Sequence, residues 1–279
     1  MPGTPDLIFA VVFAVLWPLW NHFVDWPRHL EAVAAGDPRA RRSMYRRTVL
    51  EQWVLGAVAV MLFGIAGREP ATLGLAMPEG WRLWLGISAP LGYGAIALAQ
   101  VRALRAPPQA LAGVRAQVEP LRALIPVTRE DWQAFAPLAV TAGVCEELLF
   151  RGYLVWFLTP WLGLWGAAGA SMVIFGVAHG YQGPSFAVRA FFAGVVMGAL
   201  ALATGSVVPS MVLHALVDLA GGYAGFMAMR DGAAVRAVTR VESAAGEPAG
   251  SPAPPTPEPS AGELAPEQPA IPLEHDRAE

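Results

Sequence analysis

Residues 145–152 read CEELLFRG, and they lie in a stretch that is otherwise almost entirely apolar. The motif places Glu146 beside Glu147 and follows them with Arg151. An ionisable side chain at the centre of a membrane span costs about 3 kcal/mol on insertion scales, so three such residues need compensation within the protein. We therefore expect a membrane-crossing helix whose charged side chains face other helices or a water-filled cavity.

Composition predicts a polytopic membrane protein rather than a soluble domain. The chain has 279 residues, of which 55% are hydrophobic and only 15% charged, and its mean hydropathy is +0.44. A bilayer core needs about 20 mostly apolar residues for each helix. We expect an all-α transmembrane helical bundle of about seven spans, with the first span retained rather than removed as a signal peptide. The expected spans are residues 7–24, 48–66, 83–101, 134–158, 162–179, 186–203 and 206–228.

The distribution of arginine predicts the orientation of these spans. The loop at residues 26–47 carries six arginines, whereas the loop at residues 67–82 carries two. Because arginine-rich loops stay in the cytoplasm, we expect the amino terminus outside and the carboxyl terminus in the cytoplasm. Residues 1–230 are expected to form the membrane domain, with its motifs within about residues 134–228. Residues 231–279, rich in Pro, Ala and Glu, are expected to be a disordered cytoplasmic tail.

Charge and cysteine content argue against several classes of function. The net charge is −3 and the chain contains no lysine, so nothing predicts a basic surface for nucleic acid. The single cysteine, Cys145, has no partner for a disulfide or a CxxC motif, and we interpret it as a small buried apolar residue. We expect the lipid bilayer as a partner and no nucleic acid.

The two adjacent carboxylates are predicted to have different surroundings. Glu147 and Arg151 are four residues apart on one helical face, with the acid toward the amino end, which is the favourable order for an ion pair. Glu146 is turned about 100° away from Glu147 and is not aligned with Arg151. This division suits a general base beside a structural ion pair. The motif alone is equally consistent with a salt bridge that only fixes helix packing.

Two further motifs place polar residues on apolar helices. FGVAH, residues 175–179, puts His179 at the end of the fifth expected span. HALVD, residues 214–218, puts His214 and Asp218 on one face of the seventh. A lone membrane histidine is more often a hydrogen-bonded packing residue than a catalyst. Two histidines, together with the acids and the arginine, on three of the last four spans favour a functional site.

EELLFRG, FGVAH and HALVD together fit the EExxxR, FxxxH and HxxxN/D motifs of the CPBP family of intramembrane proteases. The family includes the CAAX prenyl endopeptidases and the Abi-like bacteriocin-immunity proteins. The resemblance covers about residues 134–228 and keeps the order of the motifs. Each motif is weak alone, but three in order on apolar helices form a specific pattern.

The resemblance implies a helical bundle around a water-accessible cavity. In such a site Glu146 activates a water molecule for attack on a peptide carbonyl, and Glu147 with Arg151 holds Glu146 in place. The resemblance further implies that His179 binds or polarises the water and that His214 faces the tetrahedral intermediate.

Asp218 stands where many family members have asparagine. An ionised carboxylate cannot donate a hydrogen bond to an oxyanion. We therefore expect Asp218 to accept a hydrogen bond from His214 and to set the tautomer of that ring.

Two routes to hydrolysis remain open at this point. Glu146, His179 and His214 are an adequate set of zinc ligands with water in the fourth position. The chain has no HExxH motif, and hydrolysis by a glutamate-activated water without metal is equally compatible with the resemblance. We prefer the metal-free route.

The expected function is therefore that of an intramembrane endopeptidase acting on a membrane-associated peptide or protein. A proton-coupled transporter would also place acids and histidines in mid-membrane, but it predicts inverted repeats, which the sequence does not display. A catalytically silent scaffold is a further alternative. Arginine as the only strong base, with abundant Ala, Gly and Pro, indicates a GC-rich bacterial source, so we expect the bacterial cytoplasmic membrane and substrates without a prenyl group.

Overall fold

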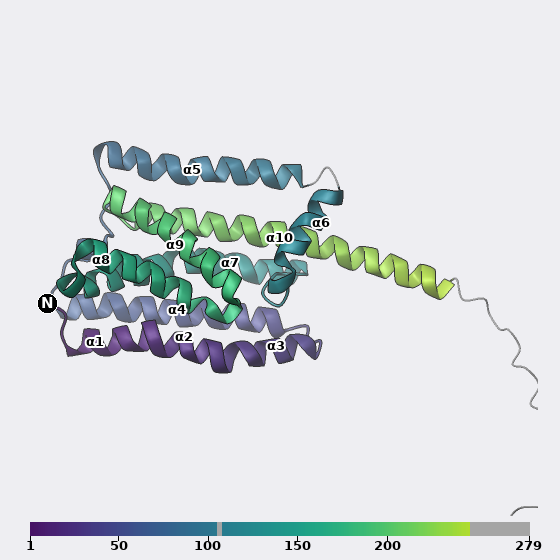
Figure 1. Cartoon of the computed structure of the whole chain (residues 1–279), viewed down its shortest axis with the longest axis horizontal. Coiled ribbons are helices and arrows are strands. Elements are labelled where there is room, and N and C mark those ends of the chain that lie inside the picture. The colour runs from purple at the N-terminus through teal and green to yellow at the C-terminus, as the bar shows by residue number, and fades with distance from the viewer. Residues whose placement is uncertain (105–107, 246–279) are drawn as a thin grey trace, which may run out of the picture. The chain divides into compact units, whose positions relative to one another are not determined.

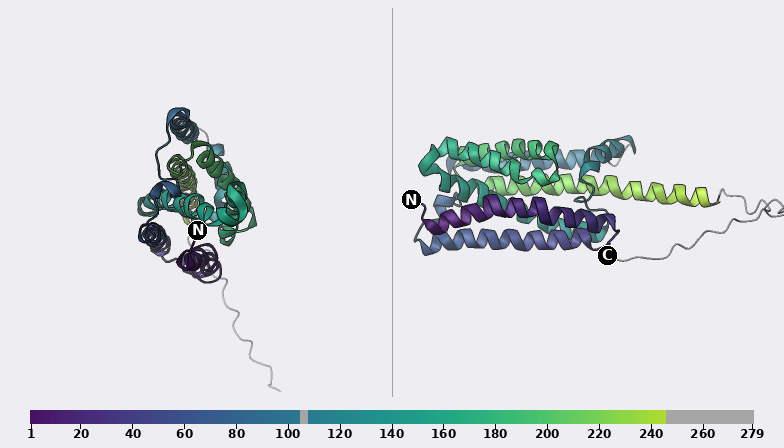
Figure 2. Two further views of the ribbon diagram at one scale, coloured as in Figure 1. Left: turned by 90° about the vertical axis from the view of Figure 1, so that its left-hand side faces the viewer. Right: turned by 60° about the horizontal axis from the view of Figure 1, so that its bottom comes forward.

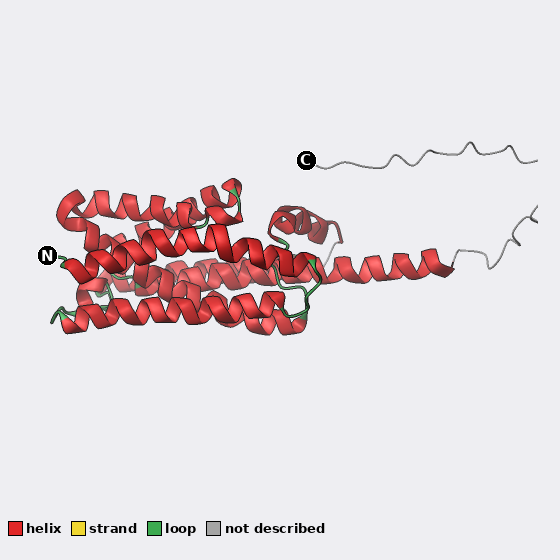
Figure 3. Ribbon diagram, turned by 90° about the horizontal axis from the view of Figure 1, so that it is seen from below, coloured by secondary structure: helices red, strands yellow, loops and turns green. Residues whose placement is uncertain are grey.

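The computed structural model describes residues 1–104 and 108–245, and within them it contains helices and no strand. Residues Met1–Arg236 form one compact unit, to which the following description applies. Its helices run mostly side by side, and α6 lies across one end of them (Figures 1 and 2). Figure 3, coloured by secondary structure, shows that the described residues form helices joined by loops. The helices are α1 (Thr4–Val11), η1 (Val12–Leu16), α2 (Trp17–Trp20), η2 (Asn21–Asp25), α3 (Trp26–Ala34), α4 (Ala40–Ile65), η3 (Pro70–Leu73), α5 (Gly80–Ala103), α6 (Pro108–Val118), η4 (Glu119–Leu121), α7 (Arg129–Glu146), η5 (Glu147–Leu154), α8 (Val155–Ala178), η6 (Gly180–Gln182), α9 (Pro184–Thr204) and α10 (Val208–Ala245).

The prediction of an all-α polytopic bundle is confirmed. Within the described residues, six helices are long and apolar enough to cross a membrane. The longest, Arg129–Gln182, covers two of the expected spans, 134–158 and 162–179. The orientation of the spans stays a prediction. Helix α10 continues to Ala245, and residues 246–279 of the expected tail lie outside the described residues.

The chain reverses direction near Gly163, inside the element assigned as α8. Gly163 has φ 65° and ψ 169°, which breaks the helix there. Beyond the break, Ser171 Oγ donates a hydrogen bond to the Phe150 carbonyl at 2.6 Å, and the rings of Phe150 and Phe175 pack edge to face with centroids 5.0 Å apart. The segment after Gly163 therefore runs back along η5. This return brings His179, at the end of α8, to the level of Glu146.

The first span is one long helix, Thr4–Ala34, with Pro5 in its first turn and two further prolines, Pro18 and Pro27, in its interior. Proline lacks an N–H group and its ring clashes with the carbonyl four residues earlier. A π-helical turn precedes each interior proline: η1 ends just before the Trp17–Pro18 pair and η2 just before Trp26–Pro27. The wider π turn accommodates each proline without ending the helix.

Side chains of the first two spans hold the segment that leads into α7. His29 Nε2 lies 3.0 Å from the Ala123 carbonyl, and the Tyr45 hydroxyl donates to the Leu124 carbonyl at 2.6 Å. Helix α7 then begins with a capping box, in which Thr128 and Asp131 satisfy backbone N–H groups of the first turn. These contacts position the helix that ends at Glu146.

A buried ion pair joins the beginning of the first span to the end of the second. Arg68 donates to both Asp6 carboxylate oxygens at 2.8 and 2.7 Å, and the hydroxyl of Tyr153, in η5, donates to the Asp6 carbonyl at 3.1 Å. The Arg68 guanidinium also lies over the Trp156 ring at 4.5 Å. Arg68 is outside the candidate spans, and its hydrogen bonds to Asp6 raise the pKa of the guanidinium. The Asp6–Arg68 pair and the Tyr153 hydrogen bond therefore connect the first two spans to η5.

We predict that Asp6→Asn lowers the free energy of unfolding by about 1–3 kcal/mol, because it breaks a bidentate pair around a nearly buried carboxylate. Thermal unfolding of the purified protein in detergent measures this change. Glu69→Gln, an exposed acid next to Arg68, is the matched control and is expected to leave stability within about 0.5 kcal/mol. Equal effects of the two substitutions would contradict the role of the pair.

Candidate active site

The motif at residues 146–151 spans a change of helix type. Helix α7 ends at Glu146, and π-helix η5 begins at Glu147. Within η5 the predicted ion pair is present: Arg151 Nη1 donates to Glu147 Oε1 at 3.0 Å, and both side chains are buried. The π-helix thus begins at the boundary between the two carboxylates, and π turns occur frequently at functional sites.

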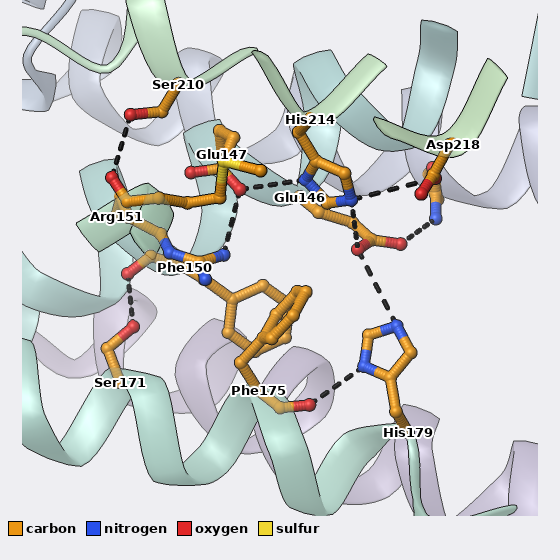
Figure 4. Close-up of polar contacts among 12 residues, drawn as sticks. Glu146, Glu147, Phe150, Arg151, Ser171, Phe175, His179, Ser210, His214 and Asp218 are labelled. Carbon is orange, nitrogen blue, oxygen red and sulfur yellow. Dashed lines mark hydrogen bonds and ion pairs between the residues drawn. The ribbon is translucent and has the colours of Figure 1, made fainter. Parts of the chain in front are cut away.

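Glu147 also holds His214. The same oxygen, Oε1, lies 2.9 Å from His214 Nδ1, so an ionised Glu147 accepts a hydrogen from that ring nitrogen (Figure 4). Nε2 of His214 then faces the opposite way, toward Glu146 and Asp218 (Figure 4). The expected role of the Glu147–Arg151 pair is corrected here: its contacts position His214 rather than Glu146.

Glu146 is held by a residue of another helix. Gln52, in α4, donates from Nε2 to Glu146 Oε1 at 2.7 Å. The other oxygen, Oε2, lies 3.8 Å from His179 Nε2 and 3.9 Å from His214 Nε2. These two distances are too long for direct hydrogen bonds, so the oxygen faces both ring nitrogens without bonding to either.

His179 has a fixed ring orientation. Its Nδ1 donates to the Phe175 carbonyl at 2.8 Å, which leaves Nε2 to face Glu146 (Figure 4). The ring of Phe175 supports the site in a second way, because the Arg151 guanidinium stacks on it at 4.2 Å and His214 packs against it edge to face. The phenylalanine of the FxxxH motif therefore links both histidines and the arginine.

Asp218 does not set the tautomer of His214, contrary to the sequence-based expectation. Its Oδ2 lies 3.7 Å from His214 Nε2, beyond hydrogen-bond distance, whereas Glu147 occupies the position at Nδ1. The reason is geometric: Asp218 is one turn further along α10 and reaches only the cavity side of the ring. The Asp218 carboxylate therefore places negative charge near His214 Nε2 without accepting a hydrogen bond from it.

A cavity of about 410 Å³ brings these groups together. We call it the catalytic cavity. Glu146, His179, His214 and Asp218 all line it, with walls from the first span and from α4, α7, α9 and α10. Most of the remaining lining side chains are apolar, and Gln52 and Tyr181 add polar groups. A largely apolar cavity with a few convergent polar groups is the usual form of a binding site.

Comparison with known families agrees with this geometry. Residues 128–220 match the model described as type II CAAX prenyl endopeptidase Rce1-like. This match supports the assignment of the segment to the CPBP/CAAX protease family. The family segment contains all seven defined residues of the three motifs, and it excludes Gln52. No curated protein and no solved structure matches the chain.

Gln52 is the site residue that the sequence reasoning missed. It lies in the expected second span and is 2% exposed, so it is a polar amide buried among apolar residues. That feature was visible as a glutamine within the apolar run at residues 48–66. Its partner was not visible, because the contact joins α4 to α7 across 94 residues.

The donor set was also compared with the needs of a metal ion. Within the described ranges, no group of three or more His, Cys, Asp or Glu side chains is arranged to hold one. Glu146 Oε2 lies 3.8 and 3.9 Å from the two histidine Nε2 atoms, whereas ligands bound to tetrahedral zinc at about 2.0–2.1 Å lie about 3.3 Å apart. The three side chains do not close around a zinc ion as they stand.

We predict that Glu147→Gln costs about 3–5 kcal/mol of folding stability, because it leaves the buried Arg151 without its compensating charge. Glu146→Gln is the matched control: it faces the cavity and keeps an oxygen that accepts from Gln52. We expect Glu146→Gln to change the free energy of unfolding by no more than about 1 kcal/mol. Unfolding of both variants in the same detergent tests the difference, and equal losses would show that Glu147 has no special structural role.

Proposed function

We propose that this member of the CPBP/CAAX protease family is an intramembrane endopeptidase in which Glu146 activates a water molecule. The substrate is a peptide bond of a membrane-associated protein or peptide. One observation supports the proposal: Glu146 Oε2 faces the Nε2 atoms of both His179 and His214, at 3.8 and 3.9 Å, and all three residues line the catalytic cavity.

The hydrogen-bond inventory determines which groups hold the water. Both histidine rings use Nδ1 as a donor, to Phe175 and to Glu147, so Nε2 of a neutral ring is an acceptor. Three acceptors facing one water exceed its two hydrogens. We therefore propose that one ring carries a second proton, and we assign it to His214, because Glu146, Glu147 and Asp218 surround that ring.

The reaction then follows from these positions. The water donates to Glu146 and His179 and attacks the substrate carbonyl carbon, while Glu146 takes its proton. Protonated His214 donates from Nε2 to the developing oxyanion, and the nearby Asp218 carboxylate stabilises the imidazolium. Glu146 returns the proton to the leaving nitrogen as the carbon–nitrogen bond breaks. The products are a carboxylic acid, which keeps the second hydrogen of the water, and an amine.

The expected source of substrates is the bacterial cytoplasmic membrane, and we propose peptides without a prenyl group. The cavity walls are mainly apolar, which suits a membrane-associated segment. A quenched fluorescent CAAX-type peptide, synthesised with and without a farnesyl group, is a suitable probe in proteoliposomes. Equal cleavage of the two forms supports the proposal, and cleavage of the farnesylated form alone contradicts it.

We predict that Glu146→Gln lowers kcat/KM for cleavage of the probe by about 10²–10⁴-fold, the usual contribution of a general base. Glu79→Gln, an exposed acid before α5, serves as control and is expected to cleave at the wild-type rate. A comparison of peptide pools from cells with wild-type protein or Glu146→Gln extends the test to natural substrates. If the two peptide pools were indistinguishable and the Glu146→Gln variant cleaved the probe at the wild-type rate, the result would favour a catalytically silent scaffold.

Gln52→Leu is predicted to lower kcat by about 10–10²-fold with little change in KM, because the carboxylate of Glu146 loses the donor that fixes its rotation. The control is Trp53→Phe, which removes the neighbouring contact between α4 and α7, from Trp53 Nε1 to the Thr141 hydroxyl at 3.1 Å. An unchanged kcat for Gln52→Leu would show that Gln52 does not position the base.

Metal content tests the choice between the two routes to hydrolysis. We expect purified protein to hold far less than one zinc per chain and to keep its activity in the presence of chelators. Stoichiometric zinc that is lost in His179→Ala would overturn the metal-free route while leaving the site residues in place.

A further inference from the structure

One arginine lines the catalytic cavity but has no part in the proposed reaction. Arg189 is the only charged residue of α9, which is a candidate membrane span of 21 residues. It lies in the second turn, about 8 Å along the axis from the start of the helix. An ionisable residue inside a span is costly and usually has a function, so the position of Arg189 needs a physical reason.

Helical periodicity places Arg189 at the rim of the catalytic cavity. The residues of α9 that line the cavity recur at helical spacing and form one stripe: Phe186, Arg189, Ala190, Ala193 and Met197. Arg189 is on the edge of this stripe, next to Phe192, which is 61% exposed and in a membrane-spanning chain faces lipid. The Phe186 ring packs against the ring of His179 with centroids 6.2 Å apart. The rim at Arg189 is therefore on the His179 side of the cavity.

The guanidinium of Arg189 is available to a bound molecule. The residue is exposed, and within the described part of the chain its side chain has no ion pair and no hydrogen bond. Asp25 also lines the cavity, but it is already paired with Arg47. Arginine presents five N–H groups in a planar fork that matches the two oxygens of a carboxylate. The open side chain therefore suits an anionic group of a ligand.

The charges of the other walls determine where such a group can bind. Glu146 and Asp218 place two carboxylates on the lining, and the charge of Asp25 is balanced by Arg47. An acidic group of a substrate is therefore repelled on the side of Asp218, on α10, and attracted on the side of Arg189, on α9. Because most of the lining is apolar, these interactions are screened less than they are in water.

We propose that Arg189 is a specificity-determining residue that binds a carboxylate of the substrate peptide. The inference rests on the proposed function, since it needs a peptide in the catalytic cavity. The carboxylate belongs either to an Asp or Glu side chain or to a free carboxyl terminus, and both present the same pair of oxygens to the guanidinium. A lipid phosphate fits less well, because it stays at the membrane surface, whereas Arg189 lies inside a span and in the same cavity as Glu146.

Peptide binding tests the proposal without requiring cleavage. The probes are acetylated, amidated ten-residue peptides of Ala and Leu that carry a neutral fluorophore and one Glu at successive positions. A second set has Gln in place of Glu, and a third has Gln and a free carboxyl terminus, so the three sets distinguish the two sources of carboxylate. Fluorescence anisotropy with the full-length protein in phosphatidylcholine nanodiscs gives Kd. We expect a carboxylate at one place in the peptide to lower Kd at least fivefold relative to its neutral counterpart.

Substitutions of Arg189 test whether this residue causes the preference. Arg189→Gln is expected to reduce the ratio of the two Kd values to about one. Arg189→Glu is expected to reverse the preference, in favour of a peptide with Lys at the same position. Arg102→Gln removes an exposed arginine of α5 that does not line the cavity, and as the matched control it should keep the preference. An unchanged ratio in Arg189→Gln contradicts the proposal, as does equal binding of all peptides or binding of none.

The remaining outcomes separate this site from a lipid site and from the reaction itself. Phosphatidylglycerol in the nanodiscs could raise the Tm of the wild type but not of Arg189→Gln, while acidic and neutral peptides bind equally. That result would assign Arg189 to a lipid head group and overturn the proposal. A preference for the carboxylate without cleavage of any peptide would support the site and contradict only the endopeptidase function.

Discussion

The arrangement of the site depends on one carboxylate oxygen. Oε1 of Glu147 accepts hydrogen bonds from both Arg151 and His214, in a side chain with no exposed surface. A buried charge of this kind is tolerable only when opposite charge and hydrogen bonds compensate it. The same two contacts determine which nitrogen of His214 faces the cavity. Folding and the proposed chemistry therefore rely on the same interaction, which compensates the charges of Glu147 and Arg151 within an apolar helix.

The remaining groups reach this centre through features of the backbone. The break at Gly163 returns the chain along η5, so that His179 meets Glu146 although it stands at a helix end. The capping box at Thr128 and the contacts to the preceding carbonyls fix the start of α7, whose last residue is Glu146. Gln52 then orients Glu146 from α4. In this way four separate stretches of the chain contribute polar groups to the catalytic cavity.

Much of the fold and part of the site could be predicted from sequence. The cost of burying a polar side chain in lipid depends on the residues of one segment, so charged residues within an apolar run stand out in the sequence itself. Hydropathy located the apolar segments, although the break lies at Gly163, just inside the expected span 162–179, and helical spacing paired Glu147 with Arg151. Hydropathy did not show that α4 begins at Ala40, since its first turns are rich in arginine. The hydrogen-bond partner of His214 was also predicted wrongly. Asp218 is near His214 in sequence, but Glu147, on another helix, makes the hydrogen bond to the ring. Contacts between helices depend on how each helix is rotated about its axis and how deep it lies in the membrane. The hydrophobic periodicity of one segment encodes neither property. Gln52 was missed for the same reason, because its partner lies on another helix.

The most direct test of the account is an experimental structure of the protein in lipid, at a resolution that shows ordered water. We predict one water molecule at about 2.6–3.2 Å from Glu146 Oε2 and from Nε2 of both His179 and His214. Side chains that point in unrelated directions, with no shared solvent site, would contradict the central claim. An ion at about 2.0–2.1 Å from the same three atoms would replace the activated water with a metal centre.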